Sequence, residues 1–271
     1  MNFEETCKAI KEVKIQGAET IAKAAVKALL FRHDKPAVKR LLSLRPTEPA
    51  LKNSVRYVLS HYDLKKAVKE VIDHFELNHK KINQLGSSVI KNGMVIYTHC
   101  HSSTVIGILK EAKKQGKKFS VICTETRPLL QGRKTAAELA EAKIPVTLMV
   151  DSAARIALKS ADMMLLGADA ITNTKIYNKI GSEIFSIIAN KFEVPVYICT
   201  NSWKFDPKPY EEIEERPSEE IWPHAPKGVK ISNPAFEKIN PNLIEAIISE
   251  LGILDFNSFL SQVRKTYSSL F

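Results

Sequence analysis

The residues best suited to chemistry lie in one short stretch, residues 98–104, where Cys100 stands between His99 and His101. A thiol can take part in proton transfer, and a helix N-terminus or a protonated imidazole beside it favours the thiolate. The stretch follows an apolar run and ends in three hydroxyl residues that open a helical pattern. The first N–H groups of such a helix lack intrahelical partners and attract phosphate. The alternative is that Cys100 is a small buried hydrophobic residue, as free cysteines usually are.

The apolar pattern of the rest of the chain predicts the strands and helices that position this stretch. From residue 93 onward, short and nearly continuous apolar runs alternate with helical patterns, which is typical of buried parallel strands in a doubly wound sheet. A last strand is predicted at 229–232, helices at 241–251 and 258–267, and an irregular loop at 205–227. The five principal strands are predicted at 94–97, 119–123, 146–150, 163–166 and 194–199, and the helices between them at 104–114, 135–142, 152–160 and 180–191.

Residues 1–92 show helical spacing of apolar residues throughout. Asp34 and Asp63 stand where the third and fifth helices would begin, since aspartate is a preferred N-cap. The sequence therefore predicts an α/β protein with a helical N-terminal domain, residues 1–92, followed by a Rossmann-like, doubly wound parallel-sheet domain, residues 93–271. The helices are predicted at 3–13, 18–31, after Asp34, at 48–61 and from Asp63.

Each of the five predicted strands ends in polar residues, and parallel strands bring such ends to one edge of the sheet, where ligands bind. Asp169 directly follows one of them and lies well before the next helix, so it is not needed as a helix cap. Cys100 and Asp169 facing each other could serve as a proton-transfer pair. The two histidines suggest a metal, but no acidic residue completes a familiar ligand spacing. We therefore expect no metal, and the absence of Walker and Gly-x-Gly-x-x-Gly motifs disfavours nucleotide hydrolysis and nicotinamide chemistry.

The composition narrows the protein class. The net charge of +10 comes mostly from lysines spread in pairs along the 271 residues, which favours a solvated basic surface with local phosphate binding over nucleic-acid binding. No apolar run approaches the roughly 18 residues of a membrane span. The four cysteines lie far apart and the N-terminus lacks a signal-peptide core, so a reduced, cytoplasmic protein is expected.

Several motifs together resemble a known superfamily. It contains ribose-1,5-bisphosphate isomerases, methylthioribose-1-phosphate isomerases and the alpha, beta and delta regulatory subunits of translation initiation factor 2B. The resemblance covers nearly the whole chain and is strongest toward the ribose-1,5-bisphosphate isomerases. The matching stretches are Ile15-Gln16-Gly17-Ala18, Arg45-Pro46-Thr47, Thr98 to Ser102, Thr124 to Pro128, Gln131-Gly132, Asp151 to Ala154, Gly167-Ala168-Asp169, Asn178 to Gly181 and Asn233 to Phe236.

The resemblance implies an aldose–ketose isomerase that makes ribulose 1,5-bisphosphate from ribose 1,5-bisphosphate in nucleoside salvage, with no cofactor. Cys100 and Asp169 match the catalytic pair, and the expected chemistry is ring opening followed by hydrogen transfer between C1 and C2. It also implies a homo-oligomer, a dimer or a hexamer, with a small sugar phosphate as ligand. The implied substrate-binding residues are Gln16, Gly17, Ala18, Arg45, Ser102, Ser103, Thr104, Asn178, Lys179 and Lys204.

One position departs from the pattern, since Gln16 stands where the isomerases carry arginine. A neutral amide cannot clamp a phosphate with two charged hydrogen bonds as arginine does. The exact substrate therefore stays open. The alternative function is a non-catalytic regulatory subunit that binds a sugar phosphate or nucleotide, although such subunits generally lack the cysteine.

Overall fold

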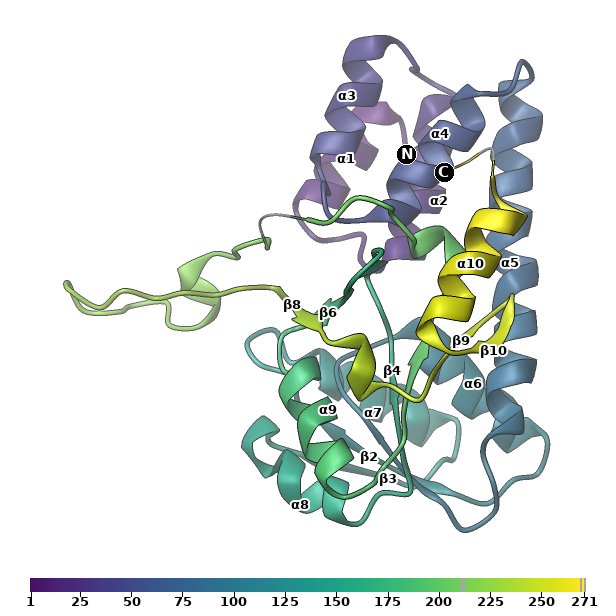
Figure 1. Cartoon of the computed structure of the whole chain (residues 1–271). Helices are drawn as coiled ribbons and strands as arrows, with labels where there is room; N and C mark the ends of the chain where they lie inside the picture. The colour runs from purple at the N-terminus through teal and green to yellow at the C-terminus, as the bar shows by residue number, and fades with distance from the viewer. Residues whose placement is uncertain (211–212, 269, 271) are drawn as a thin grey trace.

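The computed structural model describes residues 1–210, 213–268 and 270. Helices α1 to α4 gather at one end of the molecule and the main sheet lies at the other, while the long helix α5 runs beside both (Figure 1). The side chains of Asp34 and Asp63 accept hydrogen bonds from first-turn N–H groups of α3 and α5, as predicted. The helices are α1 (Phe3–Lys11), α2 (Ala18–Leu29), α3 (Lys35–Ser43), α4 (Pro49–Leu59) and α5 (Leu64–Ser88).

Helix α5 belongs to two cores. Its N-terminal half, including Val71 and Phe75, packs with α1 to α4, whereas Ile82 packs with α6 and the sheet. The helical part is therefore joined to the sheet by a continuous element, and the predicted boundary at residue 92 stays a prediction.

The predicted parallel sheet is confirmed. It has seven strands in the order β10-β9-β7-β4-β1-β2-β3, and all neighbours are parallel except β9 and β10. The chain order reverses at β1, which pairs with β2 on one side and β4 on the other, so ligands are expected beyond its carboxyl end. The strands are β1 (Val95–Thr98), β2 (Ser120–Thr124), β3 (Val146–Met149), β4 (Met163–Leu166), β7 (Val196–Cys199), β9 (Ala246–Ser249) and β10 (Gly252–Leu254).

Successive side chains of each strand point to opposite faces of the sheet. In β4, Met164 and Leu166 pack with α8, α9 and α10, whereas Met163 and Leu165 pack with α6 and the end of α5. Both faces are covered, which explains the continuous apolar runs. The covering helices are α6 (Ser103–Lys114), α7 (Gln131–Glu141), α8 (Ala154–Lys159), α9 (Ser182–Lys191) and α10 (Phe256–Thr266).

Two predictions for the C-terminal region are wrong. Residues 229–232 form no strand, and residues 241–251 form a 3-10 turn (Pro241–Leu243) followed by β9 instead of a helix. All four residues of β9 are buried, and a short buried apolar run looks the same in sequence whether it is helix or strand. A second, antiparallel sheet was not predicted. It consists of β5 (Ala170–Ile171), β6 (Ile176–Lys179) and β8 (Phe236–Ile239).

The polar region before β8 forms an arm, residues 213–235, that projects from the body (Figure 1). Backbone hydrogen bonds join its two legs near the body, from Arg216 N to Asn233 O (2.9 Å) and from Ala235 N to Glu214 O (2.8 Å). Over the described part of the predicted loop, the one helical segment is the 3-10 turn Ser218–Glu220. At its base, the arm is therefore a paired two-legged segment.

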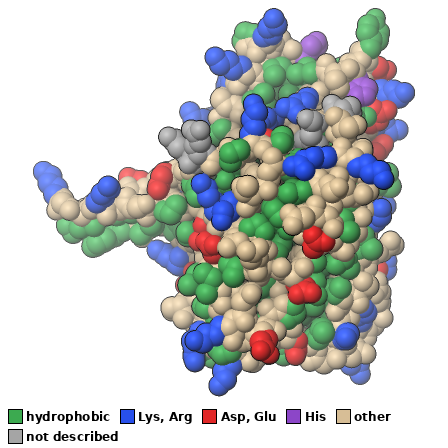
Figure 2. All heavy atoms as spheres, viewed as in Figure 1, with side chains coloured by type: hydrophobic (Ala, Val, Ile, Leu, Met, Phe, Trp, Pro, Cys, Tyr) green, Lys and Arg blue, Asp and Glu red, His purple; other side chains and the backbone are tan. Residues whose placement is uncertain are grey.

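The surface agrees with the charge pattern of the sequence. Figure 2 shows Lys and Arg side chains scattered over one face of the molecule instead of gathered in one patch. In the described part of the chain, no helix combines the length and the apolar character that crossing a membrane requires.

Gly132 shows how closely α7 approaches β2. A Cβ atom at this position would lie 1.7 Å from the carbonyl oxygen of Thr124, a backbone atom that cannot move without shifting the strand. We expect Gly132→Ala to lower the free energy of unfolding by about 2–4 kcal/mol, as overpacking does. Urea denaturation measures this change. The control Ala137→Ser, exposed on the same helix, should stay within about 0.5 kcal/mol of wild type, and an equal loss in both variants would contradict the explanation.

Candidate functional site

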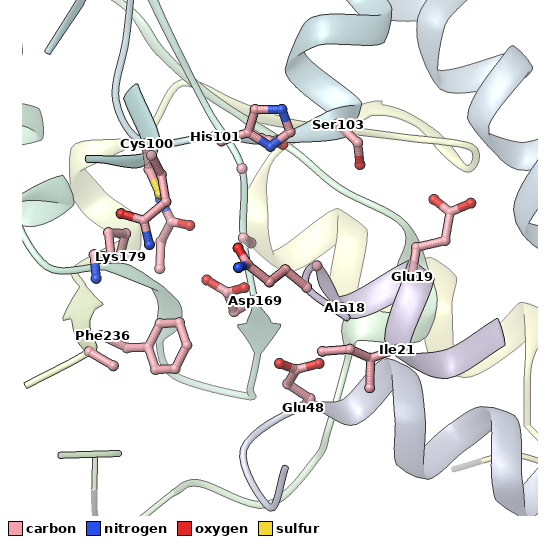
Figure 3. Close-up of a pocket in the computed structure, with 18 of the residues that line it drawn as sticks. Ala18, Glu19, Ile21, Glu48, Cys100, His101, Ser103, Asp169, Lys179 and Phe236 are labelled. Carbon is pink, nitrogen blue, oxygen red and sulfur yellow. The ribbon is translucent and has the colours of Figure 1, made fainter. Parts of the chain in front are cut away.

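A cavity of about 260 Å³ lies where the carboxyl ends of β1 and β4 meet the helical part of the chain (Figure 3). Its walls come from the turn before α2, the start of α4, the turn after β1, the segments after β4 and β7, and the base of the arm. The structure brings all the predicted site residues to this one cavity. They are Gln16, Gly17, Ala18, Arg45, Cys100, Ser102, Ser103, Thr104, Asp169, Asn178, Lys179 and Lys204.

The backbone of Cys100 is held from two sides. Its φ of 67° lies in the left-handed region, which non-glycine residues rarely adopt. Its N–H donates to Thr126 Oγ1 (2.9 Å), and Thr135 Oγ1 donates to its carbonyl oxygen (2.8 Å). These bonds from β2's end and from α7 compensate the unfavourable conformation and fix the direction of the thiol.

The thiol of Cys100 is not the thiolate that its position at a helix start favours. Burial raises the pKa of Cys100 to about 12, against the opposing effects of a backbone hydrogen bond from His101 and the charge of Lys179. Burial outweighs the helix end because the anion loses its hydration. At neutral pH, the Cys100 thiol therefore keeps its proton.

Both histidines beside Cys100 are neutral. His99 is 3% exposed, and burial lowers its pKa to about 4. Its Nε2 bonds the carbonyl oxygen of Ile180 (2.9 Å) and therefore carries the proton, while Nδ1 accepts from Thr124 Oγ1 (2.8 Å). Burial also lowers the pKa of His101, whose Nε2 lies 3.0 Å from Glu138 Oε1. The two imidazoles therefore bond the turn to neighbouring segments of the chain.

Asp169 follows β4 and faces the cavity (Figure 3). Its N–H donates to Tyr177 O (2.8 Å), which fixes the backbone against β6. Burial raises the pKa of Asp169, while the charges of Lys204 and Lys179 act in the opposite direction. Two lysines near a carboxylate favour its ionised form, so Asp169 is suited to accept a proton.

One end of the cavity is suited to phosphate. Ser102 is the N-cap of α6, and its Oγ accepts from Val105 N (3.4 Å). The N–H groups of the first turn, including those of Ser103 and Thr104, have no acceptor within the helix. Lys179 is 7% exposed and forms no ion pair with any described residue. A buried, unpaired ammonium in the same cavity as a helix N-terminus favours an anionic ligand.

Other predicted phosphate contacts already have protein partners. Gln16 Nε2 donates to Val13 O (2.8 Å), and Arg45 Nη1 lies 2.8 Å from Glu214 Oε1 of the arm. Lys204 Nζ donates to Ala168 O (2.6 Å), and Asn178 Nδ2 donates to Ser182 Oγ (2.8 Å). These residues line the cavity, but their polar groups are partly occupied by the protein.

Sequence reasoning missed five charged residues of the cavity wall, Glu19, Glu48, Lys134, Glu214 and Arg216. Three come from helices α2, α4 and α7 or their starts and two from the arm, so none directly follows a strand of the main sheet. For Glu48, the one available signal was an acidic residue directly before Pro49, at the first position of the helix predicted at 48–61; in the structure it is the N-cap of α4. Within the described residues, no three His, Cys, Asp or Glu side chains come together as metal ligands would.

Comparisons with known proteins extend these observations. Residues 8–256 match the model of the "Initiation factor 2 subunit family". The chain is 43% identical over 182 residues to a ribose 1,5-bisphosphate isomerase of Methanocaldococcus jannaschii, an alignment that covers 65% of this chain and 59% of that protein. It is 39% identical over 199 residues to a methylthioribose-1-phosphate isomerase of Syntrophus aciditrophicus, covering 66% and 54%.

Among solved structures, the chain resembles translation initiation factor eIF-2B of Pyrococcus horikoshii OT3. The TM-score is 0.86 at 26% identity, and the match covers 94% of this chain and 98% of that one. The chain spans less than two thirds of the length of the curated relatives given above. The fold is therefore shared along nearly the whole chain, whereas the sequence alignments with the curated relatives leave part of both chains unmatched.

Proposed function

The chain belongs to the initiation factor 2 subunit family, and from this premise we propose that it is a sugar-phosphate aldose–ketose isomerase. The first candidate substrate is ribose 1,5-bisphosphate, with ribulose 1,5-bisphosphate as product. The observation that carries the proposal is that Cys100 and Asp169 line one cavity beside a helix end suited to phosphate. The names of the similar proteins support the same reaction class.

The protonation states support a division of roles. C1 of ribose 1,5-bisphosphate carries both the ring oxygen and a phosphate oxygen, so opening the ring breaks the bond from C1 to the ring oxygen and requires a proton on that oxygen. The neutral thiol of Cys100 gives this proton. The ring opening leaves C1 electron-deficient, so a hydrogen moves from C2 to C1 with its bonding electron pair, which reduces C1 and oxidises C2. The C2 hydroxyl then loses its proton to Asp169, leaving the ketone. One proton has passed from Cys100 to Asp169, and exchange with solvent restores both groups.

The remaining residues bind and orient the substrate in this proposal. Lys179 and the first turn of α6, Ser102 to Thr104, hold one phosphate. Gly17 and Ala18 bring the start of α2 close to the ligand, and Arg45, Asn178 and Lys204 complete the wall. No group of this set supplies redox chemistry, in keeping with an internal hydrogen transfer.

We also propose a cytoplasmic homo-oligomer, a dimer or a hexamer. The support is a group of exposed apolar side chains on the edge strand β3 and the neighbouring helices. They are Leu148, Val150, Ile156, Ile184 and Ile187, from 41% to 65% exposed. Single exposed apolar residues are ordinary, but several on one side of a sheet are typical of an interface.

The proposed function is tested by incubating the purified protein with ribose 1,5-bisphosphate and following the product by phosphorus and carbon NMR. We expect turnover on the order of 1 s⁻¹ or faster. Methylthioribose 1-phosphate and ribose 5-phosphate serve as comparison substrates. If none of these sugar phosphates is converted, the isomerase proposal fails.

The alternative is a non-catalytic subunit that binds a sugar phosphate or nucleotide, which is favoured by the similarity to an initiation factor over nearly the whole chain. It predicts ligand binding without conversion. Calorimetry with the same sugar phosphates and with AMP separates the two functions, because the isomerase alone produces a ketose from what it binds.

A further inference from the structure

One carboxyl group in the cavity has no role in the chemistry above. Glu48 is 7% exposed and lines the cavity wall. Its Oε2 is buried and has no hydrogen-bond partner among the described residues. Figure 3 shows the carboxylate pointing into the cavity, on the side opposite Cys100 and near Asp169. Buried polar atoms are normally bonded, so an unpaired one facing a cavity indicates a missing ligand atom.

The position of Glu48 at the start of α4 does not provide a hydrogen-bond partner for its carboxyl group. Glu48 is the N-cap residue of α4, a position where acidic side chains usually bond first-turn N–H groups, but it makes no such bond. The nearby cations each bond another group through one nitrogen, although Arg45 Nε is itself buried without a hydrogen-bond partner among the described residues. Arg45 pairs with Glu214 (2.8 Å), and Lys204 donates to Ala168 O (2.6 Å). Glu48 is therefore free to bind a ligand.

The surroundings raise the pKa of Glu48 into the neutral range. Burial and the negative charge of Asp169 raise the pKa of Glu48 to about 7, although Arg45 and Lys204 oppose the rise. Burial raises the pKa of Asp169 as well, and Lys204 and Lys179 oppose that rise. The charged and titratable groups facing Glu48 are Asp169, Arg45, Lys204, Glu214 and Tyr210.

We propose that neutral Glu48 donates a hydrogen bond to a sugar oxygen bound beside Asp169. This inference rests on the proposed function, because it assigns a further substrate-binding residue to the same cavity. A neutral carboxyl has one O–H donor and an acceptor oxygen, which suits a hydroxyl or a carbonyl of a sugar. The ionised form has no proton to give and repels anionic groups, so this side of the cavity selects an uncharged part of the substrate.

The test is the pH profile of kcat/KM, from pH 6 to 9, for wild type, Glu48→Gln and Glu48→Ala. For wild type, we expect kcat/KM to fall about tenfold per pH unit above about pH 7, as Glu48 ionises. Glutamine keeps a donor and an acceptor at all pH values, so Glu48→Gln should retain activity at pH 6 within about threefold and lose this alkaline decline. Glu48→Ala should lose about 10- to 100-fold at pH 6.

The control is Glu111→Gln, the same substitution at a partly buried position of α6 that does not line the cavity. It should keep the wild-type profile. An alkaline decline that persists unchanged in Glu48→Gln would overturn the proposal, as would full activity of Glu48→Ala. Circular dichroism and urea denaturation show whether each variant is folded. If Glu48→Ala is unfolded, the isosteric Glu48→Gln alone is compared with wild type.

A wild type without turnover would refute the proposed function but would leave Glu48 open to measurement. In that case, calorimetry measures the Kd of ribulose 1,5-bisphosphate at pH 6 and pH 8.5. We expect binding by wild type to weaken about tenfold relative to Glu48→Gln between these pH values, because only wild type loses the donor. An equal pH dependence in both proteins would refute the role of Glu48.

Discussion

Replacing Cys100 by serine is expected to lower kcat by about 10²- to 10⁴-fold, the usual contribution of a positioned acid. Serine is nearly the same size, so the cavity and the backbone bonds from Thr126 and Thr135 should persist. Its hydroxyl is a far weaker acid than a thiol and gives up a proton to the ring oxygen less readily. KM should change much less than kcat, since the thiol acts on the reacting atoms.

The control for Cys100→Ser is Cys7→Ala, which removes a buried thiol from α1, away from the cavity. Its turnover should equal that of wild type, even if its stability is lower. Both variants are assayed at saturating ribose 1,5-bisphosphate by product NMR. If Cys100→Ser retained full kcat, Cys100 would not be the proton donor, whether or not the protein is an isomerase.

Much of the sheet could be predicted because the apolar pattern of each strand matches the burial of that strand in the fold. The run Met163–Leu166 is apolar throughout since both faces of β4 are covered, and such a run is recognisable without knowledge of the neighbours. The polar residues after β1 and β4 then fall on the same edge for geometric reasons. This is why Cys100 and Asp169 could be placed together although they are far apart in sequence.

The remaining features depend on contacts that no local pattern records. Residues 246–249 form a strand because they insert beside β7, and the same apolar run would suit a helix. The neutral state of Cys100 results from burial by several elements, whereas its sequence neighbours alone favour the thiolate. Glu48 and Glu214 reach the cavity from the start of α4 and from the arm, so only the folded chain shows that they meet Asp169.

Asp169→Asn is expected to lower kcat by about 10²- to 10⁴-fold, because an amide of the same shape cannot accept the hydroxyl proton at neutral pH. Substrate binding should weaken less, since Lys179 and the first turn of α6 are unchanged. The assay is the same product NMR. The control Asp73→Asn, exposed on α5 and outside the cavity, should behave as wild type, and full kcat in Asp169→Asn would exclude Asp169 as the base.

The same variant has a second consequence that a purely structural role for Asp169 would not produce. The negative charge of Asp169 raises the pKa of Glu48, so removing the charge should lower that pKa. Glu48 would then ionise at lower pH, and the alkaline decline of the residual kcat/KM should begin below its position in wild type. In the double variant with Glu48→Gln, this shifted decline should disappear, because neither position 48 nor position 169 can then ionise. A decline that stays in place in Asp169→Asn would mean that the two carboxyls do not interact.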